Sequence, residues 1–127
     1  MDGNAIGSKR GREPEVFLYE GEESAEELAV RRDIASVRIG PRVEEIPREA
    51  FRGFTNLTEV EFDDKGALQV IGESAFERCS ALRRVTLPPG VTKLGESAFQ
   101  ECCNLAELNL NEGLRTIGDD AFNFCAK

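Results

Sequence analysis

The chain has 127 residues, which suits one domain, and 40% of them are hydrophobic, which supports a packed core. Its 24 acidic and 16 basic residues give a formal net charge of −8, and this excess of acid disfavours nucleic acid as a main ligand. Histidine is absent, so Ser-His-Asp and Cys-His catalytic groups are excluded within this chain. We therefore predict that the protein is not an enzyme.

The N-terminal residues carry no apolar stretch of the kind that a signal peptide needs. No apolar run approaches the roughly 18 residues of a membrane-spanning helix, so no membrane partner is expected and an intracellular location is favoured. Residues 1–13 are predicted to form a disordered tail. Their basic stretch at 8–12 leaves a weak nuclear-import signal as an alternative interpretation.

Residues 14–33 are predicted to cap the N-terminal end of the core. The sequence Val-Phe-Leu-Tyr at 16–19 favours an edge strand that covers the first coil. Ser24 followed by Glu27 forms a capping-box pattern, which predicts a helix from there to about Arg32.

A repeat of about 23 residues organises residues 34–127. Its clearest mark is an Ala-Phe pair whose phenylalanines stand 25, 23 and 23 residues apart. An aliphatic residue precedes each phenylalanine by five positions, and apolar residues follow by six, nine and eleven positions. Glycine recurs four positions before the later phenylalanines. The phenylalanines are Phe51, Phe76, Phe99 and Phe122, and the glycines are Gly72, Gly95 and Gly118.

Each repeat combines a strand pattern with a helix pattern. Alternating apolar residues predict short strands at roughly 36–40, 59–63, 84–88 and 107–111, stacked in parallel about 4.8 Å apart. Ser74-x-x-Glu77 and Ser97-x-x-Gln100 match capping boxes, so the Ala-Phe segments are predicted to be short helices. The predicted fold is an α/β solenoid with parallel strands on one face and helices on the other, with about four coils after the N-terminal cap.

At these positions the sequence resembles the BspA-like leucine-rich repeats, whose 23-residue unit reads I-G-x-x-A-F-x-x-C-x-x-L-x-x-[VI]-x-[LI]-P. The resemblance covers roughly residues 34–127 and implies a leucine-rich-repeat fold. It also implies a recognition module, in a family with many cell-surface members, and not a catalyst. The best-matching coil contributes Ile71, Gly72, Ala75, Phe76, Cys79, Leu82, Val85, Leu87 and Pro88.

Three cysteines share one repeat position, namely Cys79, Cys102 and Cys125. They are predicted to be buried thiols that pack as small hydrophobic groups. A disulfide between adjacent coils and a zinc site are the alternatives that the sequence leaves open. Cys103 lies outside the pattern and is expected to face outward as the reactive thiol.

The outward residues of the strands form the predicted partner-binding face, with a plain solvated surface as the alternative. Acids on the middle strand stand between strands that carry arginine, which suits a basic or mixed-charge protein partner. We therefore predict a protein-interaction module without metal or cofactor, and an extracellular adhesion or recognition protein is the alternative. The predicted contact residues are Arg38, Glu59, Glu61, Asp63, Arg84, Thr86, Glu107 and Asn109.

The repeat predicts its next leucine at position 128, one place beyond the last residue, so the last coil is incomplete. One explanation is that the sequence is a fragment of a longer array. The other is that a second chain covers the open end, which predicts end-to-end self-association through the C-terminal coil.

Overall fold

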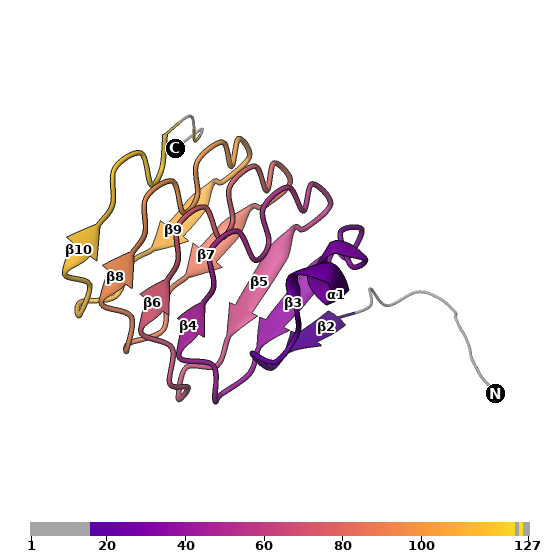
Figure 1. Ribbon diagram of the computed structural model, residues 1–127. Coiled ribbons are helices and arrows are strands. Elements are labelled where there is room, and N and C mark those ends of the chain that lie inside the picture. The colour runs from indigo at the N-terminus through magenta and orange to yellow at the C-terminus, as the bar shows by residue number, and fades with distance from the viewer. Residues whose placement is uncertain (1–15, 124, 126–127) are drawn as a thin grey trace.

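The computed structural model describes residues 16–123 and 125, and the structural statements below concern these residues. The chain forms a β-solenoid of about four turns in which parallel strands of successive coils lie side by side (Figure 1). One sheet has the order β2-β3-β5-β7-β9 and a second sheet has the order β10-β8-β6-β4. No helix in the described part of the chain is long and apolar enough to span a bilayer.

The five-stranded sheet confirms the predicted strands. Its members are β2 (Val16–Tyr19), β3 (Ser36–Ile39), β5 (Glu59–Phe62), β7 (Arg84–Thr86) and β9 (Glu107–Asn109). All pairs are parallel, and inward residues one coil apart stand in register, as in Val37 opposite Val60 and Val85 opposite Leu108. The outward side of the sheet therefore presents the alternate residues of each strand.

The N-terminal elements also lie where the sequence predicts them. Strand β2 pairs in parallel with β3 and adds one strand to the edge of the sheet. Helix α1 (Ala25–Ala29) begins after Ser24, and both capping-box hydrogen bonds form between Ser24 and Glu27. The helix is shorter than predicted, because it ends at Ala29 and a series of turns leads on toward Ile34.

The second sheet was not predicted. It consists of two-residue strands, and periodicity cannot indicate an element of that length. Each strand places one aliphatic residue of the repeat toward the core. Its members are β4 (Glu45–Ile46), β6 (Val70–Ile71), β8 (Lys93–Leu94) and β10 (Thr116–Ile117).

The prediction of short helices in the Ala-Phe segments is wrong. Ser74 and Ser97, which were expected to cap them, have φ angles of 57° and 59°. This left-handed conformation is incompatible with starting a right-handed helix there. Their N–H groups instead donate to the carbonyls of Glu96 and Asp119 in the following coil, both at 2.9 Å. Bonds between coils replace the bonds within a helix.

The Ala-Phe segments form a regular hydrogen-bonded ladder. In the first three Ala-Phe segments, the phenylalanine and the residues two positions before and after it donate their N–H groups to carbonyls of the next coil. In the first coil these donors are Glu49, Phe51 and Gly53, and they bond to the carbonyls of Glu73, Ala75 and Glu77 at 2.8–2.9 Å. Tight turns close the remaining bonds within each segment.

The recurring glycines allow the coils to approach closely at the start of this ladder. A Cβ atom on Gly95 would stand 2.6 Å from the backbone N of Glu73, and one on Gly118 would stand 2.5 Å from that of Glu96. Only a residue without a side chain fits these positions without moving the neighbouring coil.

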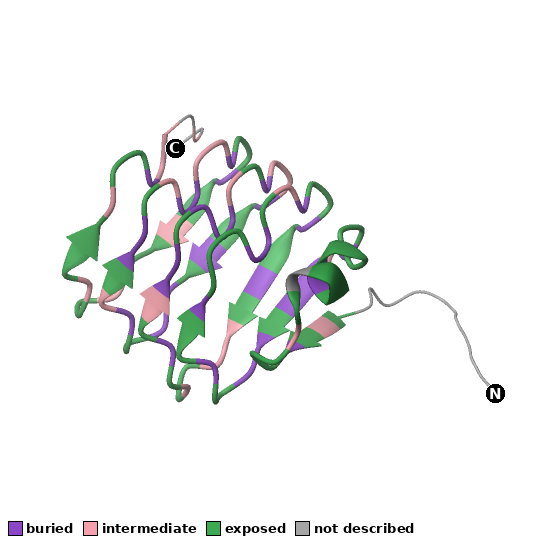
Figure 2. Ribbon diagram, viewed as in Figure 1, coloured by how far each residue is buried: buried purple, intermediate pink, exposed green. Residues whose placement is uncertain are grey.

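Buried residues, coloured purple on the ribbon in Figure 2, form one continuous hydrophobic cluster from coil to coil. Phe51, Phe76 and Phe99 stack with ring centroids 5.3 Å apart and nearly parallel planes, and Phe122 continues the stack at 5.5 Å. Tyr19 closes the N-terminal end with an edge contact to Phe51. The predicted phenylalanine ladder is therefore confirmed.

The last coil departs from the predicted burial. Leu110 and Ile117 occupy inward positions of the repeat, yet they are 45% and 49% exposed. Phe122 is half-buried. The cause is that no further coil within the described residues covers this coil. End-to-end association through it stays a prediction.

Candidate partner-binding face

The predicted contact residues lie together on the outward side of the five-stranded sheet. Seven of the eight are exposed, and strand alternation directs them away from the core. Asp63 is the exception: it follows β5, is half-buried, and accepts the N–H of Lys65 at 2.9 Å. It therefore closes a turn at the edge of the face.

Polar contacts join the strands across this face. Arg38 Nε lies 3.0 Å from Glu61 Oε1, and Arg84 Nε lies 3.3 Å from Glu107 Oε1. All four side chains are more than half exposed, so each pair adds little to stability. Asn109 also donates to the Thr86 hydroxyl at 3.1 Å and to Glu107 at 3.3 Å. These contacts order the side chains that a partner would meet.

The face keeps an excess of negative charge after these pairs are formed. Glu59 stands in register with Arg84, but the ion pair of Arg84 goes to Glu107 on the other side. Glu59 itself makes no ion pair with any residue in the described ranges. A hollow of about 450 Å³ lies beside it, lined by acids of and after β5, by Arg84 and Thr86, and by the prolines after β7.

The repeat alone does not predict two further residues of this face. Val16 and Leu18 belong to β2, which stands in register with β3, so their side chains lie on the same side as Arg38. They are 48% and 44% exposed, although both are large and apolar. The alternation within 16–19, where Tyr19 is buried, was the signal that could have identified them.

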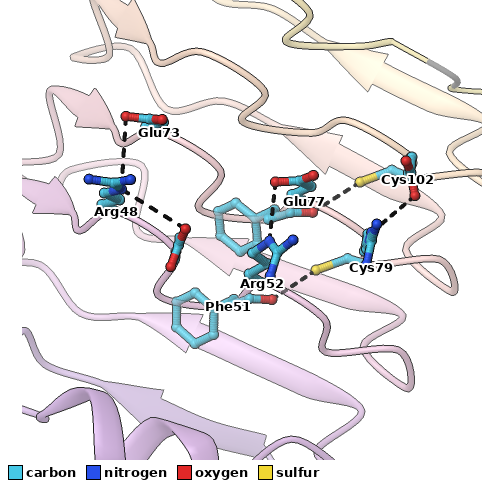
Figure 3. Close-up of polar contacts among 11 residues, drawn as sticks. Arg48, Phe51, Arg52, Glu73, Glu77, Cys79 and Cys102 are labelled. Carbon is cyan, nitrogen blue, oxygen red and sulfur yellow. Dashed lines mark hydrogen bonds and ion pairs between the residues drawn. The ribbon is translucent and has the colours of Figure 1, made fainter.

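At the shared cysteine position, Cys79 and Cys102 are buried as predicted, whereas Cys125 is only half-buried. Cys79 and Cys102 are free and fully buried, and their Sγ atoms donate to the carbonyls of Phe51 and Phe76, both at 3.2 Å (Figure 3). Cys125 repeats this bond to the Phe99 carbonyl at 3.1 Å. Burial raises the pKa of the Cys79 thiol to about 12 and also raises the pKa of Cys102. These thiols remain protonated and unreactive at neutral pH.

Cys103 differs from its neighbours because its side chain is exposed, as predicted. Its Sγ lies 3.4 Å from the carbonyl of Glu101. Across the residues that could be searched, no cluster of three or more His, Cys, Asp or Glu side chains is arranged to hold a metal ion.

Charged pairs also connect the coils on the Ala-Phe side. Arg52 Nε lies 3.2 Å from Glu77 Oε1, and Arg48 makes a longer contact of 3.9 Å to Glu73 (Figure 3). Both guanidinium groups therefore turn toward the following coil. The Glu77 side chain is only 13% exposed, so this pair is better shielded from water than those on the strand face.

Stacked parallel strands, a phenylalanine spine and a repeat of 23 residues define a leucine-rich-repeat solenoid. The family model described as "BspA type Leucine rich repeat region (6 copies)" matches residues 29–127, and the chain belongs to this family. The resemblance seen in the sequence is thus confirmed. A search of curated proteins finds no match.

Solved structures show the same architecture. A leucine-rich repeat protein from Bacteroides ovatus is 35% identical, with a TM-score of 0.67 over 72% of this chain and 23% of its own. The T. pallidum leucine-rich repeat protein TpLRR is 29% identical, with a TM-score of 0.66 over 70% of this chain and 41% of its own. The pneumococcal vaccine antigen PcpA, at 19% identity and a TM-score of 0.60, shares the fold over 86% of this chain and 32% of its own. The chain thus spans less than half the length of each.

Proposed function

We propose that this chain is a non-catalytic protein-interaction module that binds its partner through the outward face of the five-stranded sheet. One observation carries the proposal. The core positions on the Ala-Phe side repeat from coil to coil, as Phe51, Phe76 and Phe99 do, whereas the outward strand positions differ between adjacent coils. The first outward row reads Ser36, Glu59, Arg84 and Glu107, and the second reads Arg38, Glu61, Thr86 and Asn109.

This difference has a physical reason. Residues that bond to the next coil must satisfy the same geometry in every coil, but outward strand residues are free of that constraint. A face whose residues vary along the axis presents a non-repeating pattern of charge and shape, which is what recognition of one particular partner needs. The exposed pair Val16 and Leu18 adds apolar contact area at the edge of that pattern.

The charges on the face favour a basic or mixed-charge protein. Arg38 and Arg84 are already paired with glutamates. Glu59 and Asp64, which line the hollow, make no ion pair within the described residues. A lysine or arginine of a partner would gain from these carboxylates, and the ordered arginines at the flanks would meet acids of the same partner.

The test exchanges charge on this face and on a control surface. The double variant Glu59→Lys and Glu61→Lys is compared with Glu45→Lys and Glu96→Lys, which makes the same change in net charge on exposed residues elsewhere. Cross-linked partners are captured from lysate with each form. Loss of a specific partner from the first variant alone is expected, and an identical partner set for both variants and the wild type would refute the proposal.

We further propose that the partner is met in a reducing compartment, consistent with an intracellular location. The support is that the described cysteines are free and that two of them are buried. Protein isolated from its native source should then yield four titratable thiols after unfolding, the number in the sequence. Disulfides between coils would instead favour the alternative, an extracellular recognition protein.

A further inference from the structure

The first Ala-Phe segment differs from the later ones in its hydrogen bonding. In the following coils, the residues at positions −3, −1 and +1 from the phenylalanine accept N–H bonds from the preceding coil, as Glu73, Ala75 and Glu77 do. The equivalent residues of the first segment are Arg48, Ala50 and Arg52. Their carbonyls accept no hydrogen bond from any residue between 16 and 123. These carbonyls are therefore free to accept hydrogen bonds from water or from another chain.

A hollow lies next to this row of carbonyls. It has a volume of about 350 Å³ and separates the first Ala-Phe segment from helix α1. All three of these residues line it on one side, and Leu28, Ala29 and Arg32 line it on the other. Helix α1 thus occupies only part of the space that a preceding coil would fill.

The charged side chains around the hollow are not equally available. Arg48 and Arg52 direct their guanidinium groups toward Glu73 and Glu77 of the next coil (Figure 3). Glu49 also lines the hollow, and its carboxylate lies 4.0 Å from Arg48 Nε. The carboxylate of Glu23 is occupied by N–H groups of its own loop. Arg32 lies on the hollow and forms no ion pair within the part of the chain that the structure describes.

We propose that this hollow binds an acidic peptide segment of a partner protein. The backbone of the segment donates N–H groups at alternate residues to the carbonyls of Arg48, Ala50 and Arg52, in the same way that one coil donates to the next. A carboxylate side chain of the segment pairs with Arg32. Main-chain bonds supply the affinity and the arginine supplies the selectivity. This site is separate from the strand face.

The coils themselves supply a probe for this site. The blocked peptide Leu-Gly-Glu-Ser-Ala-Phe-Gln-Glu copies residues 94–101, whose N–H groups at 97, 99 and 101 donate to the next coil and whose glutamates carry the required charge. It is titrated into the full 127-residue chain, and the carbonyl ¹³C resonances of Arg48, Ala50 and Arg52 are followed. Saturable shifts at these carbonyls are expected.

The matched control is the same peptide with N-methyl groups on its three donating amides. It keeps every side chain and charge but cannot donate, so its affinity should be at least about tenfold lower. Equal affinities for the two peptides would overturn the proposal. So would shifts confined to the strand face. Shifts of these carbonyls that depend on protein concentration without peptide would identify a second copy as the occupant and overturn the proposal of a separate partner.

Substitution of Arg32 tests whether a carboxylate of the peptide pairs with this arginine. Arg32→Gln should weaken binding of the peptide about threefold or more, with a smaller difference at high salt, whereas Arg38→Gln on the strand face should not. An unchanged affinity for Arg32→Gln would overturn the requirement for an acidic segment. The double variant Glu59→Lys and Glu61→Lys should bind the peptide as the wild type does, so failure of this proposal and failure of the proposed strand-face function are distinguishable.

Discussion

On both the strand face and the Ala-Phe side of this solenoid, equivalent residues of successive coils lie opposite one another. The contacts that they make differ between the two sides. On the strand face, alternate side chains leave the core, and the contacts between strands are exposed ion pairs such as Arg84–Glu107. On the Ala-Phe side, the contacts are stacked rings, buried thiols and backbone bonds between coils. One side can vary without loss of the fold, and the other cannot.

The difference shows how a repeat protein separates stability from recognition. Residues such as Phe99 and Cys102 contact equivalent residues above and below, so a change there disturbs two neighbouring coils. The side chains of outward residues such as Thr86 are joined to the neighbouring strand by exposed polar bonds. We therefore expect substitutions to lower the free energy of unfolding strongly on the Ala-Phe side and weakly on the strand face.

Phe99→Ala should have the largest effect. The ring is 1% exposed and lies between Phe76 and Phe122, so its removal leaves a cavity in the middle of the spine. We expect the free energy of unfolding to fall by about 3–5 kcal/mol, measured by chemical denaturation. Phe122→Ala, at the half-buried end of the stack, should cost less. An unmoved midpoint for Phe99→Ala would contradict the core assignment.

Gly95→Ala should destabilise the fold by about 1–3 kcal/mol, because its Cβ atom would stand 2.6 Å from the backbone of the preceding coil. The control is Gly53→Asn. Gly53 has a φ of 77° and open space around its Cβ position, and the equivalent residues of later coils are Arg78 and Glu101. Asparagine tolerates this conformation, so the control should cost much less. Equal losses would mean that close approach of the coils does not explain the glycine repeat.

The buried thiols should make stability fall at high pH. The pKa of Cys79 rises from its usual 9.0 to about 12 in the folded chain, so the thiol stays neutral when folded but ionises on unfolding. Its contribution is complete below pH 9 and is lost as the pH rises toward 12. Burial raises the pKa of Tyr19 too, which acts in the same direction. Denaturation midpoints of the wild type and Cys79→Ala should converge above pH 9, and parallel curves would contradict this account.

Arg84→Gln should have the smallest effect, below about 1 kcal/mol, because its pair with Glu107 is exposed. Arg52→Gln on the Ala-Phe side should cost more, because it leaves the shielded carboxylate of Glu77 without its partner. Denaturation of the two variants under one condition compares the sides directly. A larger loss for Arg84→Gln would reverse the assignment of structural and recognition surfaces.

Features that depend on local alternation or on the repeat interval could be predicted from the sequence. Val37 and Val60 are one coil apart and alternate with polar or charged neighbours, which is enough to predict stacked strands. The spacing of Phe76 and Phe99 similarly predicts the spine. The capping box at Ser24 succeeds because α1 obtains its hydrogen bonds locally, within a single turn.

The same capping pattern fails at Ser74 because the competing bonds come from another coil. A local pattern cannot reveal that Glu96 will offer its carbonyl to the Ser74 N–H. For the candidate site, alternation correctly predicts exposed positions such as Glu59 and Arg84. It could not indicate which acid remains unpaired, because the choice of Glu107 as the partner of Arg84 depends on side-chain packing across strands.

The ladder of the Ala-Phe side has one more consequence, which concerns the electric field of the molecule. All of its bonds between coils run in the same direction, from the N–H of one coil to the carbonyl of the next, as from Phe51 to Ala75 and from Phe76 to Ala98. The peptide dipoles on this side therefore add along the solenoid axis, as they do in a long helix. The first coil presents acceptors and the last presents donors. The acceptor end at the first coil is the negative end of this field, which favours N–H donors over acceptors there.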